Sequence, residues 1–187
     1  MKTRFFSTLV TTCLFATPLL AVDNACPLGD DPQETIENLK YCSIKELENL
    51  FLSLENGPMP HGGQTGGGFS RACRLNECKD SDPLAVAFYK GADLIWRSMT
   101  FYGDENGGPI ENNWVGGLSF LRGTAAYETF PPDKKEAIRI RYNQPILGRV
   151  TDFIRELHPN VYFAMSTSRD NFSPVGFFVL DFTENKD

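Results

Sequence analysis

The segment PVGFFVLDF, from Pro174 to Phe182, places bulky apolar side chains at positions that face both sides of a β-strand. Phe177 and Val179 alternate with Phe178 and Leu180, and successive side chains of a strand point to opposite faces of its sheet. One face of such a strand can pack on a helix while the other lines an interior. The need to bury both faces of the strand favours a small closed barrel over an open sheet with one buried face. A β-sandwich is the alternative.

Further strand-like segments precede this one and are rich in β-branched and aromatic residues. They are Leu94–Gly103, Gly117–Gly123, Ala137–Tyr142, Val150–Leu157 and Val161–Ser168, with GGFSRA and TAAYETF as two additional candidates. Turn-forming sequences such as GDENGGP and SRDNFSP separate them. Successive short strands without intervening helices predict a mainly β fold, an antiparallel meander that closes into a small barrel.

Helical patterning is confined to the region from about residue 33 to 55. Ser43 and Glu46 have the spacing of a capping box, and the apolar residues that follow recur on one helical face until Gly57 and Pro58 end the pattern. A shorter helix is predicted from Gln33 to Tyr41. The Gly-rich stretch from His61 to Phe69 lacks the lysine of a phosphate-binding loop, so we expect a loop between helix and sheet.

The first 21 residues have the features of a signal peptide. Lys2 and Arg4 form a short basic region, an apolar stretch follows, and Ala21 ends it with a small residue. We therefore expect an exported protein, periplasmic or secreted, with no membrane anchor, in which residues 22–187 form a single domain with N-terminal helices. The formal net charge of the chain is −6, which disfavours nucleic acid as a partner.

Four of the five cysteines lie outside the predicted signal peptide. An even number of cysteines in an exported chain indicates disulfide bonds. Pairing of sequence neighbours predicts Cys26–Cys42 and Cys73–Cys78, although the other two connectivities remain open. A four-cysteine zinc site is disfavoured by the long spacing of the first pair, and we expect neither a metal nor a cofactor.

The order of these segments resembles a group of lipocalin-like proteins that begin with a Gly-x-Trp-x-Gly motif. The residues that carry the resemblance in the second half are Tyr142, Pro145, Asp152, Phe153, Ile154 and Arg155. The resemblance covers about Ser43 to Phe182. Phe69 and Arg71 depart from the opening motif, standing where it has Trp and the second Gly. The resemblance implies a calycin-type barrel that holds a small apolar molecule.

Arginines within strands are the strongest candidates for ligand contacts. Arg97 alternates with Ile95, Met99 and Phe101, and a charged group on an apolar face must find a partner or a ligand. Arg139 and Arg141 alternate with apolar residues and are predicted to face either solvent or the barrel interior. Aromatic and apolar neighbours complete the predicted ligand-binding set: Trp96, Met99, Phe101 and Tyr142.

Asp152 and Arg155 lie in one predicted strand, on opposite faces if the strand is regular. Each can pair with an adjacent strand, for example Asp152 with Arg139 or Arg141. Alternatively, Arg155 points into the barrel and binds the carboxylate or phosphate of a ligand, and it is included in the predicted ligand-binding set on this basis.

The sequence contains only two histidines, both in turn-like contexts, and it has no G-x-S-x-G motif. These features favour a binding protein over an enzyme. The leading hypothesis is an exported binding protein for a small hydrophobic or amphipathic, lipid-like ligand in a barrel cavity. The alternative is an exported protein-interaction module, of the inhibitor or immunity type, with a barrel filled by side chains.

Overall fold

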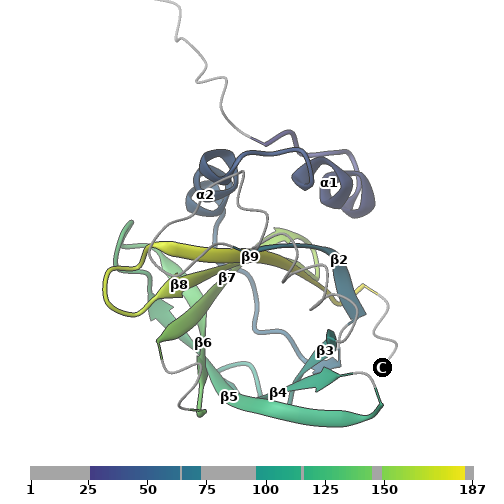
Figure 1. The fold of residues 1–187 in the computed structure, drawn as a ribbon, viewed down its shortest axis with the longest axis vertical. Coiled ribbons are helices and arrows are strands. Elements are labelled where there is room, and N and C mark those ends of the chain that lie inside the picture. The colour runs from purple at the N-terminus through teal and green to yellow at the C-terminus, as the bar shows by residue number, and fades with distance from the viewer. Residues whose placement is uncertain (1–25, 64, 73–95, 115, 145–148, 184–187) are drawn as a thin grey trace, which may run out of the picture.

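The computed structural model describes residues 26–63, 65–72, 96–114, 116–144 and 149–183. These residues form two short helices and a nine-stranded antiparallel sheet that curls into a half-barrel (Figure 1). The predicted mainly β, lipocalin-like architecture is confirmed. The predicted signal peptide lies outside the described residues.

Both predicted helices are present and each begins with a capping interaction. Helix α1 (Pro32–Leu39) follows Asp31, whose side chain accepts a hydrogen bond of 2.8 Å from the backbone N–H of Glu34. Helix α2 (Ile44–Ser53) begins after Ser43 with the predicted capping box, since Ser43 Oγ accepts from the Glu46 N–H and the Glu46 carboxylate accepts from the Ser43 N–H.

The predicted disulfide between Cys26 and Cys42 is confirmed, with a Cα–Cα distance of 5.7 Å. It ties the residues before α1 to the turn that enters α2. Both sulfur atoms are buried in the cluster between helices and sheet. The other predicted pair, Cys73–Cys78, lies outside the described residues.

The sheet has the strand order β1-β3-β4-β5-β6-β7-β8-β9-β2. The bounds of its strands are β1 (Gly62–Gly63), β2 (Thr65–Ala72), β3 (Trp96–Phe101), β4 (Gly107–Trp114), β5 (Leu118–Thr129), β6 (Glu136–Tyr142), β7 (Val150–His158), β8 (Val161–Ser168) and β9 (Pro174–Asp181). From β3 to β9 each strand pairs with the next in sequence. This is the meander that the turn-separated strand segments predict.

The Gly-rich stretch brings the two ends of this meander together. Only residue 64 separates β1 from β2; β1 pairs with β3, whereas β2 pairs with β9. The expectation of a loop from His61 to Phe69 is therefore wrong, and the expectation that GGFSRA adds a strand is confirmed. Backbone pairing to both ends of the meander outweighs the weak strand preference of glycine.

Two further differences concern the middle of the sheet. Strand β4 contains glycines, a proline and two asparagines and was not predicted, because such residues are depleted in strands. It is held by pairing on both sides, with β3 and β5. The segments Gly117–Gly123 and TAAYETF, predicted as separate strands, are one strand of 12 residues, β5.

Strand β8 shows why this chain needs apolar residues on both sides of its sheet, since all eight of its residues are buried. On the outer face, side chains such as Phe163 pack against Leu47 and Phe51 of α2 in one apolar cluster. On the inner face, side chains such as Tyr162 and Ala164 belong to a second cluster. Figure 1 shows both helices outside the curl, over the part of the sheet formed by β8, β9 and β2.

Ring contacts across the curl confirm that the second cluster is its interior. The rings of Phe101 in β3 and Phe182, just past β9, have centroids 5.7 Å apart. Those of Trp96 in β3 and Phe178 in β9 are 6.3 Å apart. Strands β3 and β9 lie near opposite ends of the strand order, so these contacts require the sheet to curl back on itself.

Candidate anion-binding pocket

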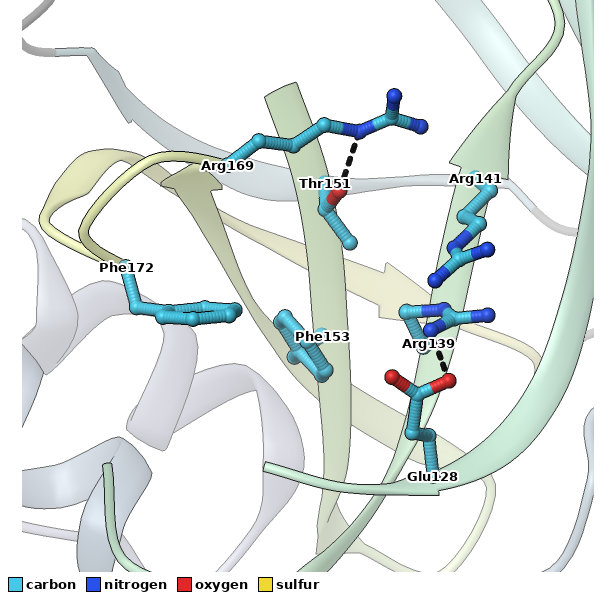
Figure 2. A pocket seen from close by; sticks show the side chains of 7 residues that line it. All are labelled: Glu128, Arg139, Arg141, Thr151, Phe153, Arg169 and Phe172. Carbon is cyan, nitrogen blue, oxygen red and sulfur yellow. Dashed lines mark hydrogen bonds and ion pairs between the residues drawn. The ribbon is translucent and has the colours of Figure 1, made fainter. Parts of the chain in front are cut away.

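A pocket of about 270 Å³ opens on the outer face of the sheet (Figure 2). Three strands and one turn line it: β5, β6, β7 and the turn between β8 and β9. Its lining residues are Glu128, Arg139, Arg141, Thr151, Phe153, Arg169 and Phe172. Arginine side chains gather on one side of it and two phenylalanine rings lie on another.

The register of β6 and β7 places four of these residues together. Arg139 is the Cα partner of Phe153, and Arg141 is the partner of Thr151. All four lie on the outer face because the intervening residues, such as Ile140, belong to the interior cluster. An alternation of arginine with isoleucine in β6 therefore directs two guanidinium groups to one side of the sheet.

The turn after β8 contributes Arg169 and Phe172. Phe172 has a φ of 57°, in the left-handed region, which is unusual for a bulky side chain. Its N–H donates to the carbonyl of Ser168 at 2.9 Å, and its ring lies 6.4 Å from that of Phe153. This strained turn positions an aromatic wall beside the arginines.

Arg139 is the most buried cation of the pocket, with a side chain only 12% exposed. It forms an ion pair with Glu128, but its Nε is buried and has no hydrogen-bond partner in the described parts of the chain. Burial, followed by the positive charges of Arg141 and Arg169, lowers the pKa of Arg139 to about 10. The group still carries its charge at neutral pH, and its burial beside two other cations is unfavourable to that charge.

The two other guanidinium groups have few partners within the chain. Arg141 is exposed, and Arg169 Nε donates a long hydrogen bond of 3.4 Å to Thr151 Oγ1. Across the described parts of the chain, Glu128 is the only carboxylate that forms an ion pair with any of these three arginines. The pocket thus combines an excess of positive charge with an apolar wall, which suits an anion that carries an apolar body.

The remaining predicted ligand-binding residues lie elsewhere. Trp96, Met99, Phe101 and Tyr142 belong to the interior cluster, where the described side chains pack against one another. The prediction that Arg139 and Arg141 face either solvent or the interior holds only for Arg141, which is exposed, since Arg139 is largely buried on the outer face. The eight predicted residues therefore do not form one site.

Arg97 is exposed, so the prediction that it lies on an apolar face is wrong. Strict alternation would place it with Met99 and Phe101, both of which are buried. However, the pairing of β3 with β4 shifts register between Trp96 and Ser98. Such a bulge re-aims the side chain at the shift, and here it directs Arg97 to solvent.

Arg155 is fully buried. Its guanidinium forms two hydrogen bonds with the Asp133 carboxylate, of 2.6 and 3.0 Å, and it also donates to the carbonyls of Phe51 and Glu136. Burial raises the pKa of Asp133, but the bonds from Arg155 and Lys135 outweigh this and hold it below its usual value. Arg155 therefore joins β7 to α2 and to the β5–β6 turn, and it does not point into the barrel.

Asp152 lies on the opposite face of β7, as the alternation predicts, and is 3% exposed. Its Oδ2 accepts a hydrogen bond of 2.6 Å from the Tyr142 hydroxyl, so the predicted pairing with Arg139 or Arg141 is wrong. Its Oδ1 accepts no hydrogen bond from any residue within the described ranges. Burial raises the pKa of Asp152, and the hydroxyls of Tyr142 and Ser166 only partly oppose this.

Sequence reasoning identified two residues of the pocket and missed five. Thr151 and Phe153 were predictable, because period-two alternation in a β6–β7 hairpin places them opposite Arg141 and Arg139. Glu128 lies in the candidate strand TAAYETF, but finding it also required the register between that strand and β6. No sequence signal distinguishes Arg169 and Phe172 from other residues of a polar turn.

Within the described ranges, no group of three or more His, Cys, Asp or Glu side chains is arranged to hold a metal ion. The helices that the structure describes include none with the length and apolar character needed to span a membrane.

Comparisons with known proteins support the fold. The chain matches no family model and no curated protein in sequence. A crystal structure of a protein from Thermomonospora curvata is similar, with a TM-score of 0.50 and 14% sequence identity. The match covers 81% of this chain and 98% of that chain. At this identity, the similarity shows a shared fold alone.

Proposed function

We propose that this protein binds a small amphipathic molecule through an anionic head group. The observation that carries the proposal is the pocket in which Arg139, Arg141 and Arg169 converge beside two phenylalanine rings. Arg139 is the central residue, because its buried Nε finds no acceptor among the residues that the structure describes. The arginines would bind the head group and the rings would contact the apolar part.

The proposed site is on the outer face of the sheet, not inside the barrel. The volume of about 270 Å³ is at the low end for small-molecule pockets, which favours a small ligand. The proposal includes export, in keeping with the basic and apolar leader and the Cys26–Cys42 disulfide. It also includes membership of the lipocalin-like group with the Gly-x-Trp-x-Gly motif, on the order of residues from Tyr142 to Arg155.

Isothermal titration calorimetry with two probes tests the proposal. Octyl sulfate carries an anionic head and octyl glucoside a neutral one, on the same apolar chain. We expect octyl sulfate to bind and octyl glucoside to bind far more weakly. Arg139→Met should weaken octyl sulfate binding roughly tenfold to a hundredfold, the usual value of one charged hydrogen-bonding group.

Arg122→Met is the matched control. Arg122 is also a strand arginine paired with a glutamate, Glu111, but it lies outside the pocket. Its substitution should leave octyl sulfate binding unchanged. Equal binding of both probes, or equal effects of the two arginine substitutions, would contradict the proposal.

A protein-interaction module is the second candidate, because the described inner side chains pack into one cluster, as in a filled barrel. In that case neither probe would bind at the pocket. A stable complex with a protein partner would instead survive size-exclusion chromatography with Arg139 unchanged or substituted.

A further inference from the structure

We propose that the pocket recognises a phosphate monoester in its dianionic form, and that the phosphate displaces Glu128 from Arg139. The inference rests on the proposed function and names the head group. Glu128 would then act as a built-in competitor, which occupies the central arginine until a more highly charged anion replaces it.

The charge of the pocket favours a dianion. Three guanidinium groups and one carboxylate line it, an excess of two positive charges with Glu128 in place and of three once Glu128 has left. A carboxylate or sulfate ester would supply one negative charge, whereas a phosphate monoester supplies about 1.5 to 2 near pH 7. Since Arg139 is only 12% exposed, water compensates this excess poorly at the centre of the pocket.

The number of donors favours a group with several oxygens. Arg139 and Arg141 come from β6, Thr151 from β7 and Arg169 from the turn after β8, so several elements contribute polar groups to the pocket lining (Figure 2). Arg139 Nε is free to donate, and the Thr151 hydroxyl lies beside Arg169. Arginine is well suited to bind phosphate through paired N–H groups.

The position of Glu128 allows its carboxylate to move away from Arg139 into water. Its side chain is 40% exposed, whereas that of Arg139 is 12% exposed. Moving the carboxylate into water therefore costs less than moving the guanidinium. The ion pair uses Nη1 of Arg139, and among the described residues no acceptor meets Nε. A phosphate that accepts from Nε and Nη2 satisfies a donor that Glu128 does not, and its negative charge would repel the Glu128 carboxylate from Nη1.

The apolar wall formed by Phe153 and Phe172 favours a phosphate ester, and not inorganic phosphate, as the ligand. Both rings line the pocket and are braced by Phe130, which lies 4.7 Å from Phe153 and 6.3 Å from Phe172 between ring centroids. A free phosphate ion would leave this apolar wall in contact with water. A phosphate with an apolar substituent would cover it.

The test compares octyl phosphate with octyl sulfate by calorimetry at pH 8, where the phosphate is a dianion and the sulfate a monoanion of similar shape. We expect octyl phosphate to bind about tenfold more tightly. Inorganic phosphate should bind more weakly than octyl phosphate. Equal affinity for octyl phosphate and octyl sulfate would overturn the dianion assignment, and equal affinity for inorganic and octyl phosphate would overturn the ester assignment.

The variant Glu128→Gln tests displacement. It should tighten octyl phosphate binding roughly fivefold, the value of a partly exposed ion pair that no longer has to be broken. Glu111→Gln, which removes a strand carboxylate paired with Arg122, is the control and should have no effect. Unchanged or weaker binding by Glu128→Gln would overturn displacement. If octyl sulfate binds normally in that case, the proposed function stands; if neither octyl anion binds the wild-type protein, both proposals fail.

Discussion

Arg155 and Arg139 are two largely buried arginines on the same face of adjacent strands, but their guanidinium groups differ in how many partners they have. Arg155 is fully buried, and its guanidinium is bound by Asp133 and two backbone carbonyls, with the rings of Phe51 and Phe130 at 4.8 and 5.7 Å. Among the residues that the structure describes, Arg139 pairs with one carboxylate, and its buried Nε has no partner. The comparison teaches that a buried charge with complete hydrogen bonding stabilises the fold, whereas one left incomplete at the edge of a pocket is a candidate ligand contact.

The largest expected effect on stability comes from substituting Arg155, whose guanidinium has a complete set of hydrogen bonds. Arg155→Met should lower the free energy of unfolding by about 3–5 kcal/mol, because it leaves the carboxylate of Asp133 partly buried and unpaired. Urea denaturation followed by circular dichroism measures this. Arg122→Met, which removes an ion pair whose arginine is largely exposed, should cost less than about 1 kcal/mol. Similar losses of unfolding free energy in both variants would show that Arg155 stabilises the fold no more than an exposed ion pair does.

A second anchor of the helical layer is the disulfide. The double variant Cys26→Ala/Cys42→Ala opens a loop with a sequence separation of 16 and should lower the free energy of unfolding by about 3 kcal/mol. Since Arg155 holds α2 and the disulfide holds the segment before α1, the two losses should be nearly additive. Denaturation of the combined variant checks this, and a strongly non-additive loss would mean that the helices dock as one unit through either contact.

Asp152 extends the comparison to the inner face, where a buried carboxylate has an incomplete set of partners. Burial raises its pKa in the folded state, so the folded protein binds more protons than the unfolded chain above the unfolded value of about 3.9. The stability contributed by this group is complete below that value and is lost as the pH rises through the raised pKa.

Asp152→Asn removes this pH-dependent loss of stability, because an amide does not ionise. The side-chain carbonyl of the asparagine can still accept the hydrogen bond from the Tyr142 hydroxyl. We expect the variant to be more stable than wild type at neutral pH, with a difference that shrinks as the pH falls toward 4. Thermal unfolding between pH 4 and 8 measures the difference. A variant that is less stable at neutral pH would mean that the ionised carboxylate is stabilised in the barrel.

The smallest expected effect on stability comes from substituting Arg139, whose hydrogen bonding is incomplete. Arg139→Met should change the free energy of unfolding by no more than about 1 kcal/mol, because Glu128 is partly exposed and regains water when its partner is removed. The same variant should lose anion binding, so stability and function separate at this residue. A loss of stability as large as that of Arg155→Met would remove the distinction between the two arginines.

Local chemistry alone determined much of this protein. The capping box at Ser43 sets the start of α2, and the alternation in β7 puts Asp152 and Arg155 on opposite faces, because both effects depend on neighbours a few residues apart. The apolar residues on both sides of β8 and β9 required a sheet covered on both faces. Proximity in sequence favoured the pairing of Cys26 with Cys42, although it left the other connectivities open.

Only the tertiary structure decided which face of the sheet is inside. Alternation within a strand is the same whichever way the sheet curls, so the sequence of β6 could not show that Arg139 faces outward. Arg155 meets Asp133 because the β5–β6 turn folds back over the sheet, and Arg169 reaches the pocket because the turn after β8 lies beside β7. Partners that depend on curl and on turn placement are long-range properties of the packed chain, and the candidate site is made of such partners.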